Sequence, residues 1–247
     1  MTPVGNPQNL LIAIQSGIPL PFTTFLLKLG VPTIINLFVT YLLLKIYYRK
    51  DMTHFQLSSI ELVEEADGMY NPRLAKISIV VLIATIAGFI VSEFLNFMGI
   101  ANFGLSAVAM LGAAAIYCFS SHRTEIVKSI DYSVLIFFGG MFIVTSAIWS
   151  SGAVSILFTN YIPSPDPKDP VQSSVVISAA SIGISQVLSN VPFVALYNFV
   201  MLESGFDSQH IDQWMMLAAS STIAGNLTVL GAASNVIIIE AAESRGV

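Results

Sequence analysis

Long apolar runs alternate with short polar segments along the chain. Because roughly 20 mostly apolar residues suffice to cross a membrane as a helix, several runs are long enough for a span. Four are uninterrupted: Phe22 to Tyr48, Leu74 to Phe97, Phe103 to Phe119 and Tyr132 to Trp149. Two more, Val171 to Leu202 and Ile211 to Ala242, are apolar overall but carry polar interruptions. The pattern predicts an all-α, polytopic membrane protein.

The composition agrees with insertion into a bilayer. Hydrophobic side chains make up 55% of the 247 residues and charged ones only 10%, whereas about a quarter of an ordinary soluble domain is charged. We therefore expect a multi-pass protein of the cell membrane, plasma or inner, surrounded by lipid. The net charge of -5 without a basic patch argues against nucleic acid as a partner. The single cysteine, Cys118, predicts neither a disulfide framework nor a metal cluster.

Positive charge predicts which loops are cytoplasmic, because short loops rich in Lys and Arg stay on that side of a membrane. The polar loop 49–73 has the basic residues Lys45, Arg49, Lys50, Arg73 and Lys76 at or beside its ends. The Pro-rich connection YIPSPDPKDP has only Lys168. We therefore place loop 49–73 in the cytoplasm and the Pro-rich connection outside.

The last apolar segment is interrupted by residues that a lipid-facing helix avoids. They are Gly225, Asn226, Thr228, Gly231, Ser234 and Asn235. Backbone groups that a break frees are costly in lipid, so broken helices persist only where they are buried in protein or line a cavity. In secondary transporters such breaks form substrate and ion sites, and an Asn side chain offers both a donor and an acceptor there. The alternative is a surface of small residues for helix packing.

The same pattern occurs at the other end of the chain. The motif T-x-x-G-x-x-x-N, followed by four apolar residues, places Thr2 on Thr228, Gly5 on Gly231 and Asn9 on Asn235. Interrupted hydrophobic segments in corresponding positions of two halves indicate a transporter binding site. The repeat therefore predicts a second half-site near the first residues.

A third interruption lies in the stretch SQVLSNVP, which ends at Pro192. Pro192 lacks a backbone N–H and moves Val191 away from helical angles, so we expect a helix to end there. Together with the apolar run that follows, the stretch predicts a hairpin over about residues 150–203 whose tip enters the membrane. A plain Pro-kinked helix is the alternative.

Four stretches together resemble the ion transporter superfamily: VGNPQNLLIA, SIDYSVLIFFGGMFIV, LSNVPFVALY and AGNLTVLGAASNVIIIEAAESRGV. They are similar to citrate transporter-like permeases, which group with arsenite permeases and sodium-dicarboxylate symporters. The resemblance covers essentially the whole chain and implies two inverted repeats, each with a re-entrant hairpin and a helix broken in mid-membrane. It implies a hairpin tip at Ser189 and Asn190. The broken helices it implies contain Gly5, Asn6 and Asn9 in the first repeat, and Gly225, Asn226, Thr228, Gly231 and Asn235 in the second.

The resemblance also predicts an incomplete inverted-repeat transporter. Residues 1–48 would end the first repeat, and residues 74–247 would form the second, with three spans, the hairpin and a broken helix over about 211–245. A missing N-terminal repeat or a partner chain would complete the site. A homodimer is a further expectation.

We expect a secondary active transporter of a small anion, such as a carboxylate or arsenite, coupled to sodium or protons. The alternatives are a sodium/proton antiporter and a non-transporting half-transporter subunit. Glu240, near the end of the broken helix, is a candidate coupling group. The sequence has neither an H-E-x-x-H nor a G-x-S-x-G motif, so we predict no enzyme, no cofactor and no metal other than sodium.

Overall fold

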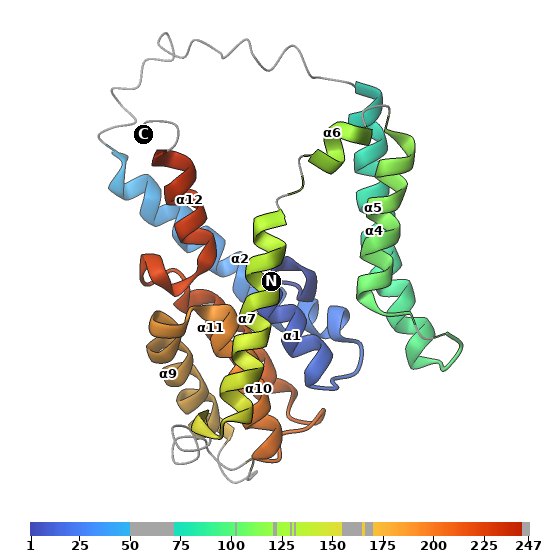
Figure 1. Cartoon of the computed structure of the whole chain (residues 1–247). Helices are drawn as coiled ribbons and strands as arrows, with labels where there is room; N and C mark the ends of the chain where they lie inside the picture. The colour runs from blue at the N-terminus through green and yellow to red at the C-terminus, as the bar shows by residue number, and fades with distance from the viewer. Residues whose placement is uncertain are drawn as a thin grey trace. The chain divides into compact units, whose positions relative to one another are not determined.

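A computed structural model describes residues 1–49, 72–101, 103–120, 123–128, 130, 132–154, 165 and 170–243. Within these ranges every regular element is a helix, which confirms the all-α prediction (Figure 1). Most of loop 49–73 and of the Pro-rich connection lies outside them. The elements are η1 (Pro3–Gly5), α1 (Pro7–Gln15), α2 (Pro21–Tyr47), α4 (Pro72–Phe97), α5 (Leu105–Phe119), α6 (Arg123–Lys128), α7 (Tyr132–Ser150), α9 (Pro170–Leu188), α10 (Asn190–Glu203), α11 (Ile211–Ala224), η4 (Val229–Gly231) and α12 (Ala233–Glu243).

Three helical stretches of the described chain are long and apolar enough to cross a membrane: Pro21–Tyr47, Ala75–Phe97 and Val171–Leu188. The first two match predicted spans. The predicted span Phe103 to Phe119 forms the shorter helix α5, and the third stretch falls in the first arm of the predicted hairpin. Helices long enough to cross a membrane therefore occur both before and after loop 49–73 in the chain.

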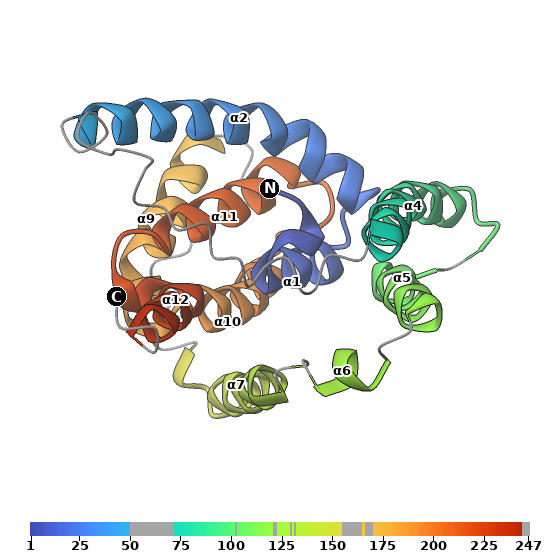
Figure 2. The same ribbon diagram turned by 90° about the horizontal axis from the view of Figure 1, so that it is seen from above.

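The chain divides into two compact units, Met1–Leu29 with Asp131–Val247, and Gly30–Ile130. In the first unit helix α10 is central, and α1, α7, α9 and α11 all pack against it (Figures 1 and 2). Its side chains are mostly buried, including Phe193, Tyr197 and Met201. Trp214 from α11 and Ile12 from α1 complete the same core. Since α1 opens the chain and α11 lies near its end, tertiary contact joins the first copy of the repeated motif to the helix that precedes the second copy.

In the second unit α4 and α5 lie side by side (Figure 2). Each helix offers a glycine where the other brings a larger residue: a Cβ at Gly88 would lie 3.0 Å from Val108 Cγ1, and one at Gly112 would overlap Thr85. Close approach through small residues is the usual way in which membrane helices pack, because lipid removes the hydrophobic driving force between them.

The hairpin bends at Ser189, not at Pro192. Helix α9 ends at Leu188 and α10 begins at Asn190, while Ser189 has a φ of 64° and a ψ of 156°. The expectation that Pro192 ends a helix is therefore wrong, because Pro192 lies in the first turn of α10. The first N–H groups of a helix have no partner within it, so a proline there removes no intrahelical bond. The first bond of α10 runs from the N–H of Phe193 to the carbonyl of Ser189, at 3.1 Å.

Candidate functional site

Helix α11 stops at Ala224 and helix α12 starts at Ala233, which leaves residues 225–232 outside α-helix. The carbonyl groups that this segment frees need donors. One side chain supplies two of them: Asn235 Nδ2 donates to the carbonyl of Gly225 at 2.6 Å and to that of Thr228 at 3.1 Å. Asn235 therefore closes the interruption from the first turn of α12.

Gln186 closes the same interruption from helix α9. Its Nε2 donates to the carbonyl of Ala224 at 2.9 Å, and its Oε1 accepts from Thr228 Oγ1 at 2.8 Å. The Thr228 hydroxyl also accepts from the N–H of Gly231 at 3.1 Å. The sequence-based prediction omitted Gln186, which is one of two glutamines in α9, a helix that also carries five serines.

The N-terminal copy of the motif has the same local backbone as the C-terminal copy. Thr2 has φ −135° and ψ 160°, and Thr228 has φ −135° and ψ 163°; each precedes a single turn of 3-10 helix and then an α-helix. The N–H of the motif glycine donates to the carbonyl of the motif threonine in both, at 3.1 Å for Gly5 and 3.2 Å for Gly231. The alignment of the two motif copies that the sequence predicts, with Thr2 on Thr228 and Gly5 on Gly231, therefore agrees with their backbone conformations.

Thr222, near the end of α11, joins the N-terminal copy to the helix that leads into the C-terminal one. Its Oγ1 accepts from Asn6 Nδ2 and from Gln8 Nε2, both at 3.4 Å. Gln8 is buried and Asn6 half-buried. These contacts hold the start of α1 beside the last turn of α11. The sequence-based prediction missed Thr222 and Gln8, which lie outside the repeated positions.

The hairpin tip reaches the interruption through Asn190. A Cβ at Gly225 would lie 3.1 Å from Asn190 Nδ2, so the absence of a side chain at Gly225 makes room for that amide. Asn190 is only 8% exposed. The structure therefore brings together Asn190, Gly225, Thr228, Gly231 and Asn235 from the predicted set.

Two predicted residues carry buried oxygen atoms without a hydrogen-bond donor, Ser189 Oγ and Asn9 Oδ1. Asn9 is 1% exposed, and its Nδ2 donates to the carbonyl of Thr2 at 3.3 Å while its Oδ1 stays unpaired. Leaving a buried acceptor unpaired costs about 1–3 kcal/mol, so native structures generally satisfy such atoms. Both atoms are oxygens, which suits a hard cation such as sodium.

Other predicted residues stay apart from this cluster. Asn226, Ser234 and Gly5 are exposed, and the side chain of Glu240 lies outside the described part of the structure. Among the described residues no group of three His, Cys, Asp or Glu is placed to hold a metal ion. The two unpaired oxygens, Asn9 Oδ1 and Ser189 Oγ, are themselves neutral.

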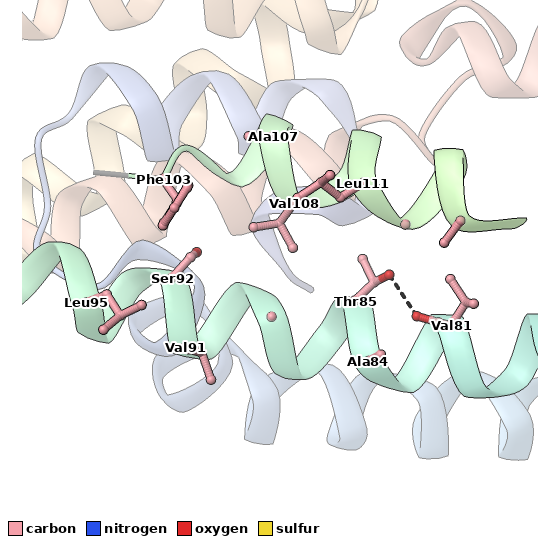
Figure 3. Close-up of a pocket in the computed structure, with 13 residues that line it drawn as sticks. Val81, Ala84, Thr85, Val91, Ser92, Leu95, Phe103, Ala107, Val108 and Leu111 are labelled. Atoms are coloured by element: carbon pink, nitrogen blue, oxygen red, sulfur yellow. Dashed lines mark hydrogen bonds between the residues drawn. The ribbon is translucent and has the colours of Figure 1, made fainter. Parts of the chain in front are cut away.

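A groove of about 440 Å³ between α4 and α5 is a different kind of site (Figure 3). Its two hydroxyl groups are engaged within their own helix: Thr85 Oγ1 donates to the carbonyl of Val81 at 2.8 Å and Ser92 Oγ to that of Phe89 at 3.1 Å. The remaining lining is hydrocarbon, including Leu95, Val108 and Leu111. The groove offers an anion no donor.

A model of the citrate transporter family matches residues 1–224. The chain is 26% identical to an uncharacterized transporter of Mycobacterium bovis, with 99% of this chain and 56% of the relative aligned. It is 28% identical to the 46 kDa membrane protein of Mycobacterium leprae, over 99% of this chain and 57% of the relative. A silicon efflux transporter of Oryza sativa is 32% identical over 46% of this chain and 24% of its own length. No solved structure matches.

The chain thus spans about half the length of the curated relatives it matches most extensively. The family and the relatives named here as transporters agree with a transporter and not an enzyme, as the sequence predicted. Together with the apolar helices, the match makes this a multi-pass membrane protein. The chain belongs to the citrate transporter family.

Proposed function

We propose that this chain forms the binding core of a secondary active transporter that moves a small anion together with sodium. The observation that carries the proposal is the pair of matching interruptions, Thr2 to Asn9 and Thr228 to Asn235, of which the first is bonded to Thr222, just before the second begins. Interrupted helices at corresponding positions of two repeats are where secondary transporters bind substrate and ion. The proposal places both interruptions at mid-membrane, in repeats of inverted topology.

Helix ends would bind the anion. Helices α1 and α12 begin directly after the two interruptions, and the start of a helix carries free N–H groups and a partial positive charge. The side chains beside these ends are neutral amides and hydroxyls, including Asn6, Thr222 and Asn190. Such a site fits a carboxylate or an oxyacid such as arsenite. The citrate transporter family model and a relative named for silicon efflux are consistent with a family that handles small oxygen-rich solutes.

Sodium is the coupling ion that the unpaired oxygens of two predicted site residues favour over the proton. Ser189 Oγ and Asn9 Oδ1 are buried acceptors without donors, and neither group titrates near neutral pH. A proton route normally uses carboxylates or histidines within the membrane. Sodium instead needs oxygen atoms alone, which these two residues supply.

Uptake into proteoliposomes tests the proposal. The native gene product is reconstituted, and uptake of citrate, arsenite and silicic acid is measured with an inward gradient of sodium or of choline. We expect sodium-dependent uptake of at least one solute and its loss in the Asn190→Ala/Asn235→Ala double variant. Asn96→Ala is a matched control, because Asn96 also makes two hydrogen bonds, both with Phe103, in the other unit.

Uptake that is unchanged in the double variant would refute the proposal. Proton-coupled sodium exchange without uptake of any of the three solutes would instead identify a sodium/proton antiporter.

A second candidate is a subunit that completes a transporter only with another chain. The intact mass of the native gene product, measured from its own membrane, separates the two. A mass near 26.6 kDa would direct the search to a partner chain, whereas about twice that mass would mean that one polypeptide carries both repeats.

A further inference from the structure

We infer that Gln186 is a positioning residue that sets the geometry of the interruption between α11 and α12, an inference that rests on the proposed function of that site. Gln186 lies in the last turn of α9, the first arm of the hairpin, and is half-buried. Its amide bonds the last residue of α11 and the threonine before η4 at once. It would thereby fix the distance between the hairpin and the backbone that binds the ligand.

The two bonds reach opposite sides of the turn. Ala224, which accepts from Gln186 Nε2 at 2.9 Å, is the last residue of α11. Thr228, which donates to Gln186 Oε1 at 2.8 Å, precedes η4. A further bond, from Nε2 to the carbonyl of Ile182 at 3.0 Å, holds the side chain against its own helix. The amide is thus oriented before it meets the turn, which lowers the entropy lost on forming the link.

The amide of Gln186 and the carbonyl groups of the interruption pack tightly around Gly231. A Cβ at Gly231 would lie 2.8 Å from Gln186 Oε1, 3.1 Å from the carbonyl oxygen of Ala224 and 3.2 Å from that of Gly225. Two of these atoms belong to the backbone and cannot swing away. A glycine is therefore required where the amide of Gln186 and the freed carbonyl groups converge.

Helices α9 and α11 are also joined one turn earlier, which keeps Gln186 in reach. Ser220 Oγ of α11 donates to Ser181 Oγ of α9 at 2.9 Å, and both residues are buried. Ser185 on the same side of α9 is fully buried as well. This contact fixes the register of the two helices, so the position of Gln186 is set by the packing and not by the turn that it binds.

The N-terminal copy of the motif has no such link within the described residues. A Cβ at Gly5 would meet only Thr2 Oγ1, at 3.2 Å, and Gly5 is exposed. Gln186 is therefore not part of the duplicated pattern. It distinguishes the second interruption from the first and ties it to the hairpin arm.

Only a group that donates and accepts together can make this link. An ionised Glu at position 186 would accept from Thr228 but would face the carbonyl of Ala224 with a second acceptor. A protonated Glu would regain the donor. Burial and the nearby carbonyl disfavour the charged form, so the pKa of such a Glu would rise above its ordinary value of about 4.3. A Met at position 186 would fill the space without either bond.

The experiment compares Gln186→Glu, Gln186→Met and the unchanged protein in proteoliposomes. The external pH is varied from about 8 to about 5.5, because a Glu with a raised pKa changes its protonation within this range. At the highest pH of this range, we expect the KM of the transported solute to rise about tenfold or more in both variants, by analogy with the loss of a buried hydrogen-bond partner. As the pH falls, we expect the KM of Gln186→Glu to return toward that of the unchanged protein and the KM of Gln186→Met to stay raised. Gln213→Glu, which adds the same charge in the first turn of α11, should behave as the unchanged protein.

A second measurement separates failure of this inference from failure of the proposed function. The thermal unfolding midpoint of each variant is followed over the same pH range in detergent, with no solute present. A midpoint of Gln186→Glu that rises toward that of the unchanged protein on acidification supports the link even if no tested solute is transported. Two variants that match the unchanged protein in KM and midpoint, or that are equally impaired at every pH, would overturn the inference.

Discussion

Asn9 and Asn235 make the same hydrogen bond at the two ends of the chain. Each donates its Nδ2 to the carbonyl of the threonine seven residues earlier, Thr2 at 3.3 Å and Thr228 at 3.1 Å. In each case the asparagine lies in the first turn of an α-helix and the threonine before a 3-10 turn. Two distant segments thus share a sequence pattern, a backbone conformation and a side-chain contact.

This shared bond predicts that Asn9→Ala and Asn235→Ala both impair transport, and by different amounts. Asn235 also donates to the carbonyl of Gly225, so its loss strands that group, whereas the carbonyls of Thr2 and Thr228 each keep the N–H of the motif glycine as a donor. A stranded buried carbonyl costs about 1–3 kcal/mol, and about 1.4 kcal/mol corresponds to a tenfold change. We expect at least a tenfold loss of kcat/KM for Asn235→Ala and a smaller loss for Asn9→Ala, measured by uptake. The reverse order would show that the two bonds are not equivalent in function.

Gly231→Ala should destabilise the protein, because its new methyl group would meet two backbone carbonyl oxygens. Overpacking of this kind typically costs about 1–3 kcal/mol, which thermal unfolding in detergent would detect. Gly183→Ala in α9 is the matched control, since no atom lies within 4 Å of its Cβ position. It should leave the midpoint unchanged or raise it, because Ala favours a helix over Gly by about 1 kcal/mol. Equal midpoints for the two variants would contradict the crowding at Gly231.

Ser189 allows backbone strain and ion binding to be tested separately. Its φ of 64° with ψ of 156° is a conformation adopted almost only by glycine, and holding another residue there costs about 1–3 kcal/mol. Ser189→Gly removes that strain together with the hydroxyl, whereas Ser189→Ala removes the hydroxyl alone. We expect Ser189→Gly to unfold at a higher temperature than Ser189→Ala. Both should lose the stabilisation that sodium gives the unchanged protein, measured in sodium against choline chloride.

Sodium stabilisation that persists in both Ser189 variants would exclude the hydroxyl as a ligand. Asn9→Ala would then be the next variant to measure, since Asn9 Oδ1 is the other unpaired buried oxygen of the cluster.

The loop before α11 should make stability depend on pH at the acidic end. The N–H of Gln209 donates to Asp207 at 2.8 Å and His210 Nδ1 lies 2.8 Å from the same oxygen, and these contacts hold the pKa of Asp207 below its ordinary value. A depressed carboxyl pKa stabilises the fold above the pKa of the unfolded chain, and this contribution is lost as the pH falls through the folded value. We expect Asp207→Asn to lower the unfolding midpoint at neutral pH, with the difference from the unchanged protein shrinking toward pH 3, below the ordinary Asp pKa of about 3.9. A difference that is constant with pH would contradict this origin.

The sequence by itself determined the features that depend on local pattern. Hydropathy over about 20 residues indicated the membrane helices, and the described helices α2 and α4 follow those runs closely. The repeated motif also gave the correct register between Thr2 and Thr228, because both of its key bonds join residues at most seven positions apart. Such contacts are encoded by spacing alone.

The hairpin bend shows where local rules fall short. Proline chemistry favoured a helix end at Pro192, yet the bend lies at Ser189, because the first turn of a helix accepts proline without losing a bond. The strain at Ser189 is maintained by the surrounding packing of α9 and α10, which no local propensity encodes.

Only the tertiary structure decided which polar residues meet. Gln186 bonds residues 38 and 42 positions away, and Thr222 accepts from side chains more than 200 positions away. In the sequence these residues are among several polar positions in mostly apolar helices, and some of those positions bond their own helix, as Ser178 does. Helix packing selects among them, since a side chain can bind a distant carbonyl only where two backbones come within reach. The pattern of the chain therefore fixed its helices and its repeat, and the packing of α1, α9, α10 and α11 fixed the site.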